Sequence, residues 1–287
     1  MNIRKIAYVD IGELGWSLNL SAHLRWLKEN TDYSLAVYTS PDRRCLYKES
    51  ADLILDIPYN FYRKFRGEQE CFGLHRGMPE EMKEYFQKLL PPGYTIPKKF
   101  NLDLNIRNHY KFLSNKIIYK PYKYSKKLEG EKKILVFPRH RGSPSFTRRN
   151  IPELFYIKLI IVLCDEFLDY EVKTIGQKFN SHNIWNDKIK KCNYRNGVKY
   201  NPDLQALIDE CQLAIGAVGS QSALPKLTLL QGVPTFMIGH QRDRHVREEN
   251  WMKTKVGFYE FRRKEYTKFN ADDCIKAVIA FMKESHA

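Results

Sequence analysis

The sequence predicts an α/β protein built from two domains, each with its own parallel sheet. Apolar runs of strand length alternate with longer segments of helical periodicity, the pattern of βαβ units. This alternation stops near residue 95 and restarts near residue 132. The chain has 287 residues, which suits two domains of roughly 100–200 residues each.

The first half begins with a strand, KIAYVDI, that runs into a glycine-containing turn and then a helix whose leucines lie on one side. A later helix opens with proline and acidic residues, which favour a first helical turn. The expected elements are strands over 5–11, 34–40 and 52–58 and helices over 16–29 and 79–90. We expect them to form a first domain over 1–125.

The second half repeats the alternation and predicts a second domain over 126–270. Asn150 and Asn270 are expected to cap the helices that follow them, and Ser220 to open another. A last segment, 271–287, predicts a C-terminal helix that packs back on the first domain. The expected elements are strands over 132–138, 170–176, 213–219 and 233–239 and helices over 151–168, 202–212, 220–231 and 271–285.

The stretch 95–133 differs from both halves. It holds 11 Lys and Arg against 3 Asp and Glu, with tyrosines interleaved. Such a stretch can stack on bases and contact phosphates, so residues 109–127 leave a nucleic-acid-binding function open. The other interpretation, which we favour, is an irregular connector whose tyrosines pack on the domain surfaces.

The composition is that of a soluble globular protein, with 43% hydrophobic and 28% charged residues. The net charge of +15 favours an acidic partner: nucleic acid, an anionic membrane surface or a phosphorylated substrate. No apolar run reaches the roughly 20 residues of a membrane span, and no secretory signal is recognisable. The six cysteines show no metal-ligand spacing, which favours reduced thiols and a cytoplasmic location.

The turn after the first strand is the first candidate site. Ligands of parallel sheets bind beyond the carboxyl ends of the strands. Gly12 and Gly15 let the backbone approach a ligand, and Glu13 between them can act as a general base. Asp10, at the end of the strand, is the second catalytic candidate. A solvated acid at a helix N-terminus is the alternative interpretation of Glu13.

A basic loop after the strand over 132–138 is the second candidate. It holds four arginines and no acid between residues 139 and 149. Arg139, Arg141, Gly142 and Ser143 lie between a strand end and a helix start, where peptide N–H groups favour anions. Because arginine forks bind phosphate oxygens in pairs, we interpret the loop as a diphosphate site. A solvated basic loop is the alternative.

The run GAVGSQSA is the third candidate, again between a strand and a helix. Gly219, Ser220, Gln221 and Ser222 predict a second nest of donors for phosphate or sugar oxygens. An ordinary capped turn is the alternative here. Lys199 precedes a helix and is a weaker candidate for contact with a nucleoside.

The chain lacks the motif G-x-x-x-x-G-K-[ST], so phosphoryl transfer by a P-loop is not expected. It also lacks a G-x-S-x-G elbow and a D-x-D pair that could hold Mg²⁺ on a nucleotide diphosphate. We therefore expect no metal and no cofactor, with phosphate charge met by arginines and helix ends.

These features together resemble a GT-B glycosyltransferase, and more closely family 9, the heptosyltransferase-like enzymes. The resemblance rests on the strand–glycine–acid–helix start, the central strand–basic loop–helix, and the late run GAVGSQSALPKLTLLQGVPTFMIG. It implies two Rossmann-like domains facing a cleft, with the acceptor on the N-terminal domain and the nucleotide-sugar on the C-terminal one. It also implies metal-independent catalysis.

The resemblance matches Gly12-Glu13 to the family's acceptor-side Gly-Asp, with the carboxylate one methylene further out. The family's phosphate-contacting loop matches the region from Arg139 to Ser143. Its Asp-Thr-Gly-x-x-His loop matches 219–222 in position alone, because the Asp and His are absent. The departure leaves the sugar and the nucleotide open.

We therefore expect an enzyme that transfers a sugar from a nucleotide-activated donor to an acceptor hydroxyl. The charge suggests an anionic acceptor: a polysaccharide, a lipid-linked glycan or modified DNA, with peripheral membrane contact as a further partner class. Two alternatives remain: a nucleic-acid-binding protein that uses 109–127, and a sugar-nucleotide epimerase.

Overall fold

A computed structural model describes residues 4–10, 14–58, 80–97, 132–142, 150–200, 202–240, 252–261 and 269–286. The chain divides into two units, Met1–Tyr119 and Lys120–Ala287. The domain boundary expected at residue 125 lies outside the described residues. Each unit has its own sheet.

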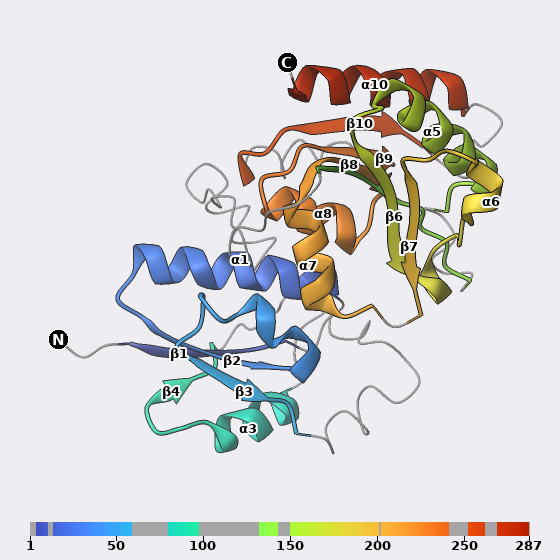
Figure 1. Ribbon diagram of the computed structural model, residues 1–287. Helices are drawn as coiled ribbons and strands as arrows, with labels where there is room; N and C mark the ends of the chain where they lie inside the picture. The colour runs from blue at the N-terminus through green and yellow to red at the C-terminus, as the bar shows by residue number, and fades with distance from the viewer. Residues whose placement is uncertain are drawn as a thin grey trace. The chain divides into compact units, whose positions relative to one another are not determined.

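The described strands of unit 1 form a parallel sheet with the order β3-β2-β1-β4 (Figure 1). Residues of β1 and β2 are almost wholly buried, which explains their continuous apolar character. The elements are β1 Lys5–Val9, α1 Leu14–Asn30, β2 Ser34–Thr39, η1 Pro41–Leu46, β3 Leu53–Asp56, α3 Glu80–Leu89 and β4 Tyr94–Thr95.

Unit 2 has a larger parallel sheet, whose described strands follow the order β10-β9-β8-β5-β6-β7. Numbered along the unit, the order is 6-5-4-1-2-3, that of the doubly wound dinucleotide-binding fold. The strands are β5 Lys133–Phe137, β6 Glu171–Gln177, β7 Tyr194–Lys199, β8 Ala214–Ser220, β9 Thr235–Gly239 and β10 Val256–Glu260. The helices are α5 Glu153–Glu166, η4 Lys178–Asn180, α6 Asn186–Ile189, α7 Leu204–Gln212, α8 Ala223–Leu230 and α10 Ala271–His286.

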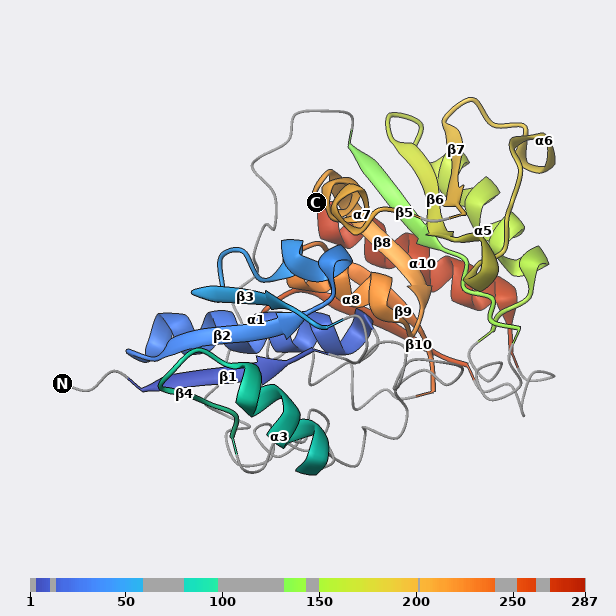
Figure 2. The ribbon, with the colours of Figure 1, turned by 90° about the horizontal axis from the view of Figure 1, so that it is seen from below.

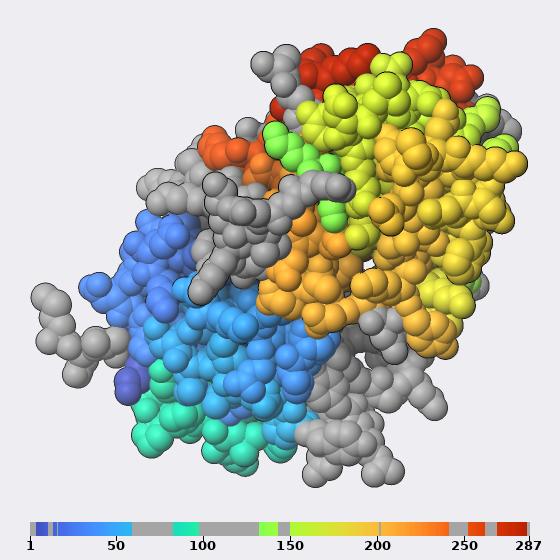
Figure 3. All heavy atoms as spheres, viewed as in Figure 1, coloured from blue at the N-terminus to red at the C-terminus, as the bar shows by residue number. Residues whose placement is uncertain are grey.

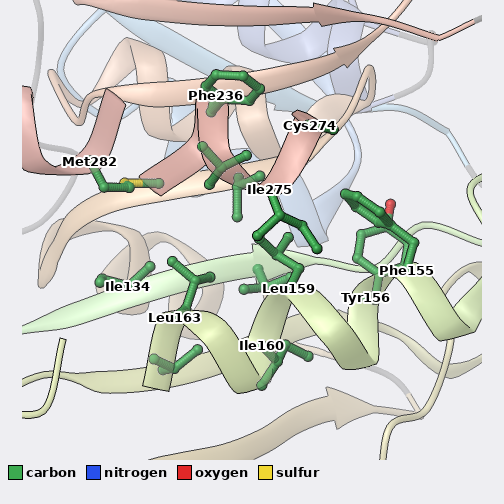
Figure 4. Close-up of a cluster of buried hydrophobic side chains, with 14 of the residues drawn as sticks. Ile134, Phe155, Tyr156, Leu159, Ile160, Leu163, Phe236, Cys274, Ile275 and Met282 are labelled. Atoms are coloured by element: carbon green, nitrogen blue, oxygen red, sulfur yellow. The ribbon is translucent and has the colours of Figure 1, made fainter. Parts of the chain in front are cut away.

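Two helices, α5 and α10, cover one face of the unit 2 sheet (Figure 2). The apolar residues of α5 recur at helical spacing, from Phe155 and Tyr156 through Leu159 and Ile160 to Leu163. They meet alternate residues of the central strands, as Figure 4 shows for the side chains around Ile134 and Phe236. On strands, alternate residues face opposite sides, so the remaining positions are available to α7 and α8.

The C-terminal helix α10 belongs to this core. Cys274, Ile275, Val278 and Met282 are buried in the same apolar cluster as α5. Its charged residues face outward, and the helix forms part of the molecular surface (red in Figure 3). The apolar face of α10 thus packs on unit 2, and the expectation that the helix also packs back on the first domain stays a prediction. Its expected cap is confirmed, because Asn270 Oδ1 accepts hydrogen bonds from the backbone N–H of Asp272 and Asp273.

The α/β class and the two parallel sheets predicted from sequence are confirmed. Three strands, β4, β7 and β10, were not predicted, and they pair at or near the sheet edges. Five helix starts differ from the prediction by one to three residues. The helix after residue 150 begins at Glu153, and the late helix begins at Ala223, with Ser220 as the last residue of β8.

Candidate functional site

The carboxyl end of β1 in unit 1 is held by a buried carboxylate. Asp10 has no exposed surface, and its two oxygens accept hydrogen bonds from three hydroxyl groups. Ser17 Oγ donates to Oδ1 at 2.9 Å, and Thr39 Oγ1 and Tyr47 OH donate to Oδ2 at 3.0 and 2.8 Å. The guanidinium of Arg43 lies 3.8 Å from Oδ1. Asp10 thus joins β1, the first turn of α1, the end of β2 and the segment after η1.

This arrangement bears on the two catalytic residues predicted from sequence. The oxygens of Asp10 already accept these bonds away from solvent, so the structure favours an anchoring role for it over proton transfer. Glu13 lies outside the described residues, and its role remains a prediction. Asp10 and Ser17, however, fix the chain on both sides of Glu13, at the end of β1 and in α1.

In unit 2 the central strands β5 and β8 run side by side. Phe137, the last residue of β5, pairs with Gly219 in β8. From β5 the chain continues to β6 and β7 on one side of the sheet, whereas β8, β9 and β10 lie on the other side of β5. The strand order therefore reverses between β5 and β8. Ligands of doubly wound sheets bind outside the carboxyl ends of strands at such a reversal. The two anion-binding loops predicted from sequence follow exactly these two strand ends.

The close approach of β8 to β5 depends on a glycine. A Cβ built on Gly219 would lie 2.7 Å from the Cβ of Phe137 and 3.1 Å from its carbonyl oxygen. Gly142, in the loop after β5, has no atom within 4 Å of such a Cβ. Of the two predicted glycines, Gly219 is required by packing and Gly142 is not.

The basic loop after β5 is held from two sides. On one side, Arg139 forms an antiparallel bridge with Ser181. The backbone N–H of His140 donates to the Asn180 carbonyl at 2.8 Å, and that of His182 to the Pro138 carbonyl at 2.7 Å. On the other side, the side chain of Asn150 bonds to residues 139 and 141. The backbone of residues 138–141 is therefore fixed before any ligand arrives.

The two predicted arginines of this loop differ in exposure. Arg139 is 6% exposed, and its Nη1 donates to Asn150 Oδ1 at 2.8 Å, whereas Arg141 is half-buried. Gly142, next to Arg141, is exposed. Ser143 lies outside the described residues, so its predicted phosphate contact remains a prediction.

The segment after β8 differs in detail from the prediction. Ser220 is fully buried, and its hydroxyl has no hydrogen-bond partner among the residues that the structure describes, so its predicted ligand contact remains a prediction. The side chain of Gln221 lies against Gly239, the last residue of β9, and its backbone N–H donates to Ile238. Ser222 is the N-cap residue of α8, but its side chain makes no capping hydrogen bond. The first N–H groups of α8 are thus not satisfied by their own cap, and they can face an anion.

A buried tyrosine lies near the two strand ends in the interior. Tyr156 comes from α5 and has no exposed surface. Burial raises the pKa of Tyr156, and the positive charge of Arg139 acts in the opposite direction. Within the described part of the chain, the hydroxyl groups of Tyr156 and Ser220 are both buried without a hydrogen-bond partner.

Lys199 lies apart from this group. It is exposed at the end of β7, where it pairs with Gln177 of β6. Because neighbouring strands lie about 4.8 Å apart, β7 is about 10 Å from β5 and about 14 Å from β8. Lys199 shares the carboxyl edge of the sheet with Arg139, but the structure does not bring it next to the arginine loop.

A histidine pair beside the basic loop was missed by sequence reasoning. The rings of His140 and His182 have centroids 4.5 Å apart, and His182 Nε2 lies 2.9 Å from the Ile151 carbonyl oxygen. Burial and the neighbouring charge of His140 lower the pKa of His182, against the raising effect of its bond to Ile151. His140 is exposed and adjoins both predicted arginines. Its place in the basic loop is the only sequence signal that marks it.

Among the residues that the structure describes, no group of three or more His, Cys, Asp or Glu is arranged to hold a metal ion. Within the same ranges, no helix combines the length and apolar character that a bilayer crossing demands.

Comparison with known proteins gives a likeness at the level of structure. No protein-family model and no curated protein matches the sequence. A family 9 glycosyl transferase from Veillonella parvula matches with a TM-score of 0.63 at 10% identity, over 99% of each chain. The E. coli heptosyltransferase WaaC with ADP matches with a TM-score of 0.59 at 10% identity, over 98% of this chain and 99% of that one.

A putative UDP-N-acetylglucosamine 2-epimerase from Listeria monocytogenes also matches, with a TM-score of 0.52 at 11% identity, over 99% of this chain and 90% of that one. At such identities the likeness concerns the fold, which extends over both units. With its two parallel-sheet units, this chain therefore has the fold of the family 9 glycosyltransferases, as the sequence resemblance predicted.

Proposed function

We propose that this chain is a glycosyltransferase that moves a sugar from a nucleotide-activated donor to an acceptor hydroxyl. One observation carries the proposal. The strand reversal of unit 2 brings a pinned basic loop and the uncapped start of α8 to adjacent strand ends. Fixed cations and aligned peptide N–H groups at such a position suit a diphosphate.

The donor diphosphate would be bound by the residues that follow β5 and β8. In the described part of the loop, His140 is exposed and Arg141 is half-buried, and the buried Arg139 adds a second guanidinium. The first N–H groups of α8 after Ser222 would contact further phosphate oxygens. Support for a nucleotide donor also comes from a structural neighbour, the WaaC protein, whose structure is described with ADP.

In the proposed reaction, Glu13 takes the proton of the acceptor hydroxyl while the acceptor oxygen bonds to the anomeric carbon of the donor. The bond between that carbon and the diphosphate oxygen breaks, and the electron pair leaves with the nucleoside diphosphate. Arg139, Arg141 and His140 would stabilise the charge that develops on this oxygen. Asp10 would act by holding the chain on which Glu13 lies.

The acceptor is proposed to be anionic, because the chain carries a net charge of +15. A polysaccharide, a lipid-linked glycan or modified DNA would each satisfy this condition. The cytoplasmic location expected from the sequence also stays a prediction.

A thermal-shift panel tests the donor site. Purified protein is melted with ADP, UDP, GDP, CMP, dTDP and inorganic pyrophosphate, and a bound compound raises the melting temperature by mass action. We expect Arg141→Ala and Arg139→Ala each to weaken binding of the compound that stabilises the wild type by about tenfold or more. Hydrogen bonds to charged groups are stronger than those between neutral groups. The matched control is Arg195→Ala. Arg195 is exposed in the edge strand β7, where it pairs with Glu171, and its loss should leave binding unchanged.

Glu13→Gln tests the base. It should lower kcat for sugar transfer while the affinity for the nucleotide stays that of the wild type. Retention of nucleotide binding in all arginine variants would refute the donor site, and wild-type turnover in Glu13→Gln would refute the base.

The epimerase function remains the second candidate, because the Listeria structure shares the fold. An epimerase would convert its nucleotide-sugar in the absence of any acceptor. Incubation of the protein with nucleotide-sugars alone, followed by chromatography, separates the two activities. The nucleic-acid-binding alternative rests on residues 109–127, which lie outside the described residues.

A further inference from the structure

We infer that Asn150 is a positioning residue of the donor site, which holds Arg139 and the backbone of Arg141 in the orientation that a diphosphate needs. The inference rests on the proposed function and names a residue that the sequence suggested only as a helix cap. It is carried by three hydrogen bonds of one side chain.

The amide of Asn150 uses both of its ends on the basic loop. Oδ1 accepts from Arg139 Nη1 at 2.8 Å and from the backbone N–H of Arg141 at 3.0 Å. Nδ2 donates to the Arg141 carbonyl at 2.8 Å. The bonds to both backbone groups of Arg141 resemble those of a strand partner, and they set the direction in which residue 141 leaves the sheet.

The structure excludes the helix cap as the reason for this residue. Helix α5 begins at Glu153, and its cap position is Pro152. Asn150 lies two residues earlier and makes its bonds to the loop instead. The next residue, Ile151, makes a hydrogen bond through its carbonyl oxygen with the ring of His182. The segment just before α5 therefore holds both residue 141 and His182.

Two like charges lie close together in this loop. Arg139 and Arg141 are two residues apart in the short segment after β5, and Arg139 is 6% exposed. Like charges at such a spacing repel one another, so their positions need support. The amide oxygen of Asn150 gives that support without adding a negative charge of its own, and the geometry of the loop is set in advance.

The test compares two asparagines of unit 2 that each make several bonds to backbone groups. Asn193 Nδ2 donates to the carbonyls of Cys164, Phe167 and Tyr170 at 3.2, 3.3 and 3.2 Å, in contact with no residue of the donor site. We measure the Kd of the full-length protein for inorganic pyrophosphate and for ADP, UDP and GDP, together with the melting temperature without ligand. Asn150→Ala should raise the Kd about tenfold, whereas Asn193→Ala should lower the melting temperature and leave the Kd unchanged.

A second variant, Asn150→Gln, keeps the amide and displaces it by one methylene. This variant covers the case in which Asn150→Ala does not fold. It should also raise the Kd, because the amide is kept but no longer lies where it can bond to Arg139 and Arg141. In a double-mutant cycle, Asn150→Ala should add little to the effect of Arg139→Ala, since Asn150 acts through that guanidinium and the adjoining backbone.

The outcomes separate the two proposals. If no probe binds the wild type, or if both Arg139→Ala and Arg141→Ala bind as the wild type does, the proposed donor site fails and the inference fails with it. If the arginine variants lose affinity while Asn150→Ala and Asn150→Gln keep it, the donor site stands and the inference is overturned. Full additivity in the cycle also overturns it.

Discussion

A single methyl group tests how closely the two strand ends of the candidate donor site approach. Substitution Gly219→Ala places a Cβ 2.7 Å from the Cβ of Phe137 and 3.1 Å from its carbonyl oxygen. Phe137 is 2% exposed and lies in the next strand, so it has little freedom to withdraw. Either the phenylalanine must leave its rotamer, or β8 must separate from β5.

The expected cost follows from these distances. Overpacking a close-packed interior costs about 1–3 kcal/mol. Replacing glycine also restricts the unfolded chain, which favours the native state by about 0.4–1 kcal/mol. The second effect is shared by any glycine-to-alanine substitution at an ordinary backbone angle, and it cancels in a comparison of two such variants.

Gly142→Ala is the matched variant, because its Cβ would meet no atom within 4 Å and its φ is not positive. Both proteins are unfolded with urea, and their free energies of unfolding are compared at constant m-value. We expect Gly219→Ala to be less stable than Gly142→Ala by about 1–3 kcal/mol. Equal stabilities would show that the ends of β5 and β8 do not approach this closely, and would refute one joint site at these two strand ends.

Three further predictions concern single residues. Asp10→Asn should cost about 1–3 kcal/mol of unfolding free energy in denaturant titration, because an amide cannot accept all the hydroxyl bonds that the carboxylate accepts. Burial alone would raise the pKa of Glu210, but hydrogen bonds and ion pairs with Lys173 and Lys133 outweigh it and lower the pKa below its ordinary 4.5. The stability from these pairs is therefore present above pH 4.5 and is lost as the pH falls through the lower native value, so Glu210→Gln should flatten acid unfolding measured by circular dichroism. Asn270→Ala should remove the cap of α10 and cost about 0.5–2 kcal/mol in denaturant titration.

Each of these predictions has its own contradicting result. Wild-type stability of Asp10→Asn would show that the carboxylate is not the shared acceptor. If Glu210→Gln unfolds in acid as steeply as the wild type, groups other than Glu210 cause the loss of stability at low pH. For α10, Asn270→Asp is the control, since aspartate also caps helices and should keep most of the stability.

The buried central strands were the most predictable part of the fold. β1, β5, β8 and β9 consist of nearly continuous apolar residues, because parallel strands are covered on both faces, and each was predicted within a few residues. The edge strand β7 has the sequence YRNGVK, whose charges and glycine give no strand signal. Its pairing with β6 is a tertiary effect that no local pattern carries.

The candidate site was predicted in outline and not in detail. Strand-end logic predicted that residues after β5 and β8 serve one site, and the register places those ends side by side. Asn150 and Ser220 were both assigned to helix starts, since their residue types favour caps. Asn150 instead bonds to the backbone of Arg141, nine residues earlier, and Ser220 is the buried last residue of β8, neither of which the residue type alone indicates.

The pairing of β5 with β8 also has a consequence for synthesis of the protein. Lys133 pairs with Ala214, and the described residues between these partners form two further strands, three α-helices and a 3₁₀ helix. A nascent chain cannot complete the centre of this sheet until the ribosome has released residue 220. Until then the apolar side of α5 and the unpaired flank of β5 are without their partners, a state that favours aggregation and chaperone capture. Messenger truncations that stop short of β8 should therefore yield insoluble fragments.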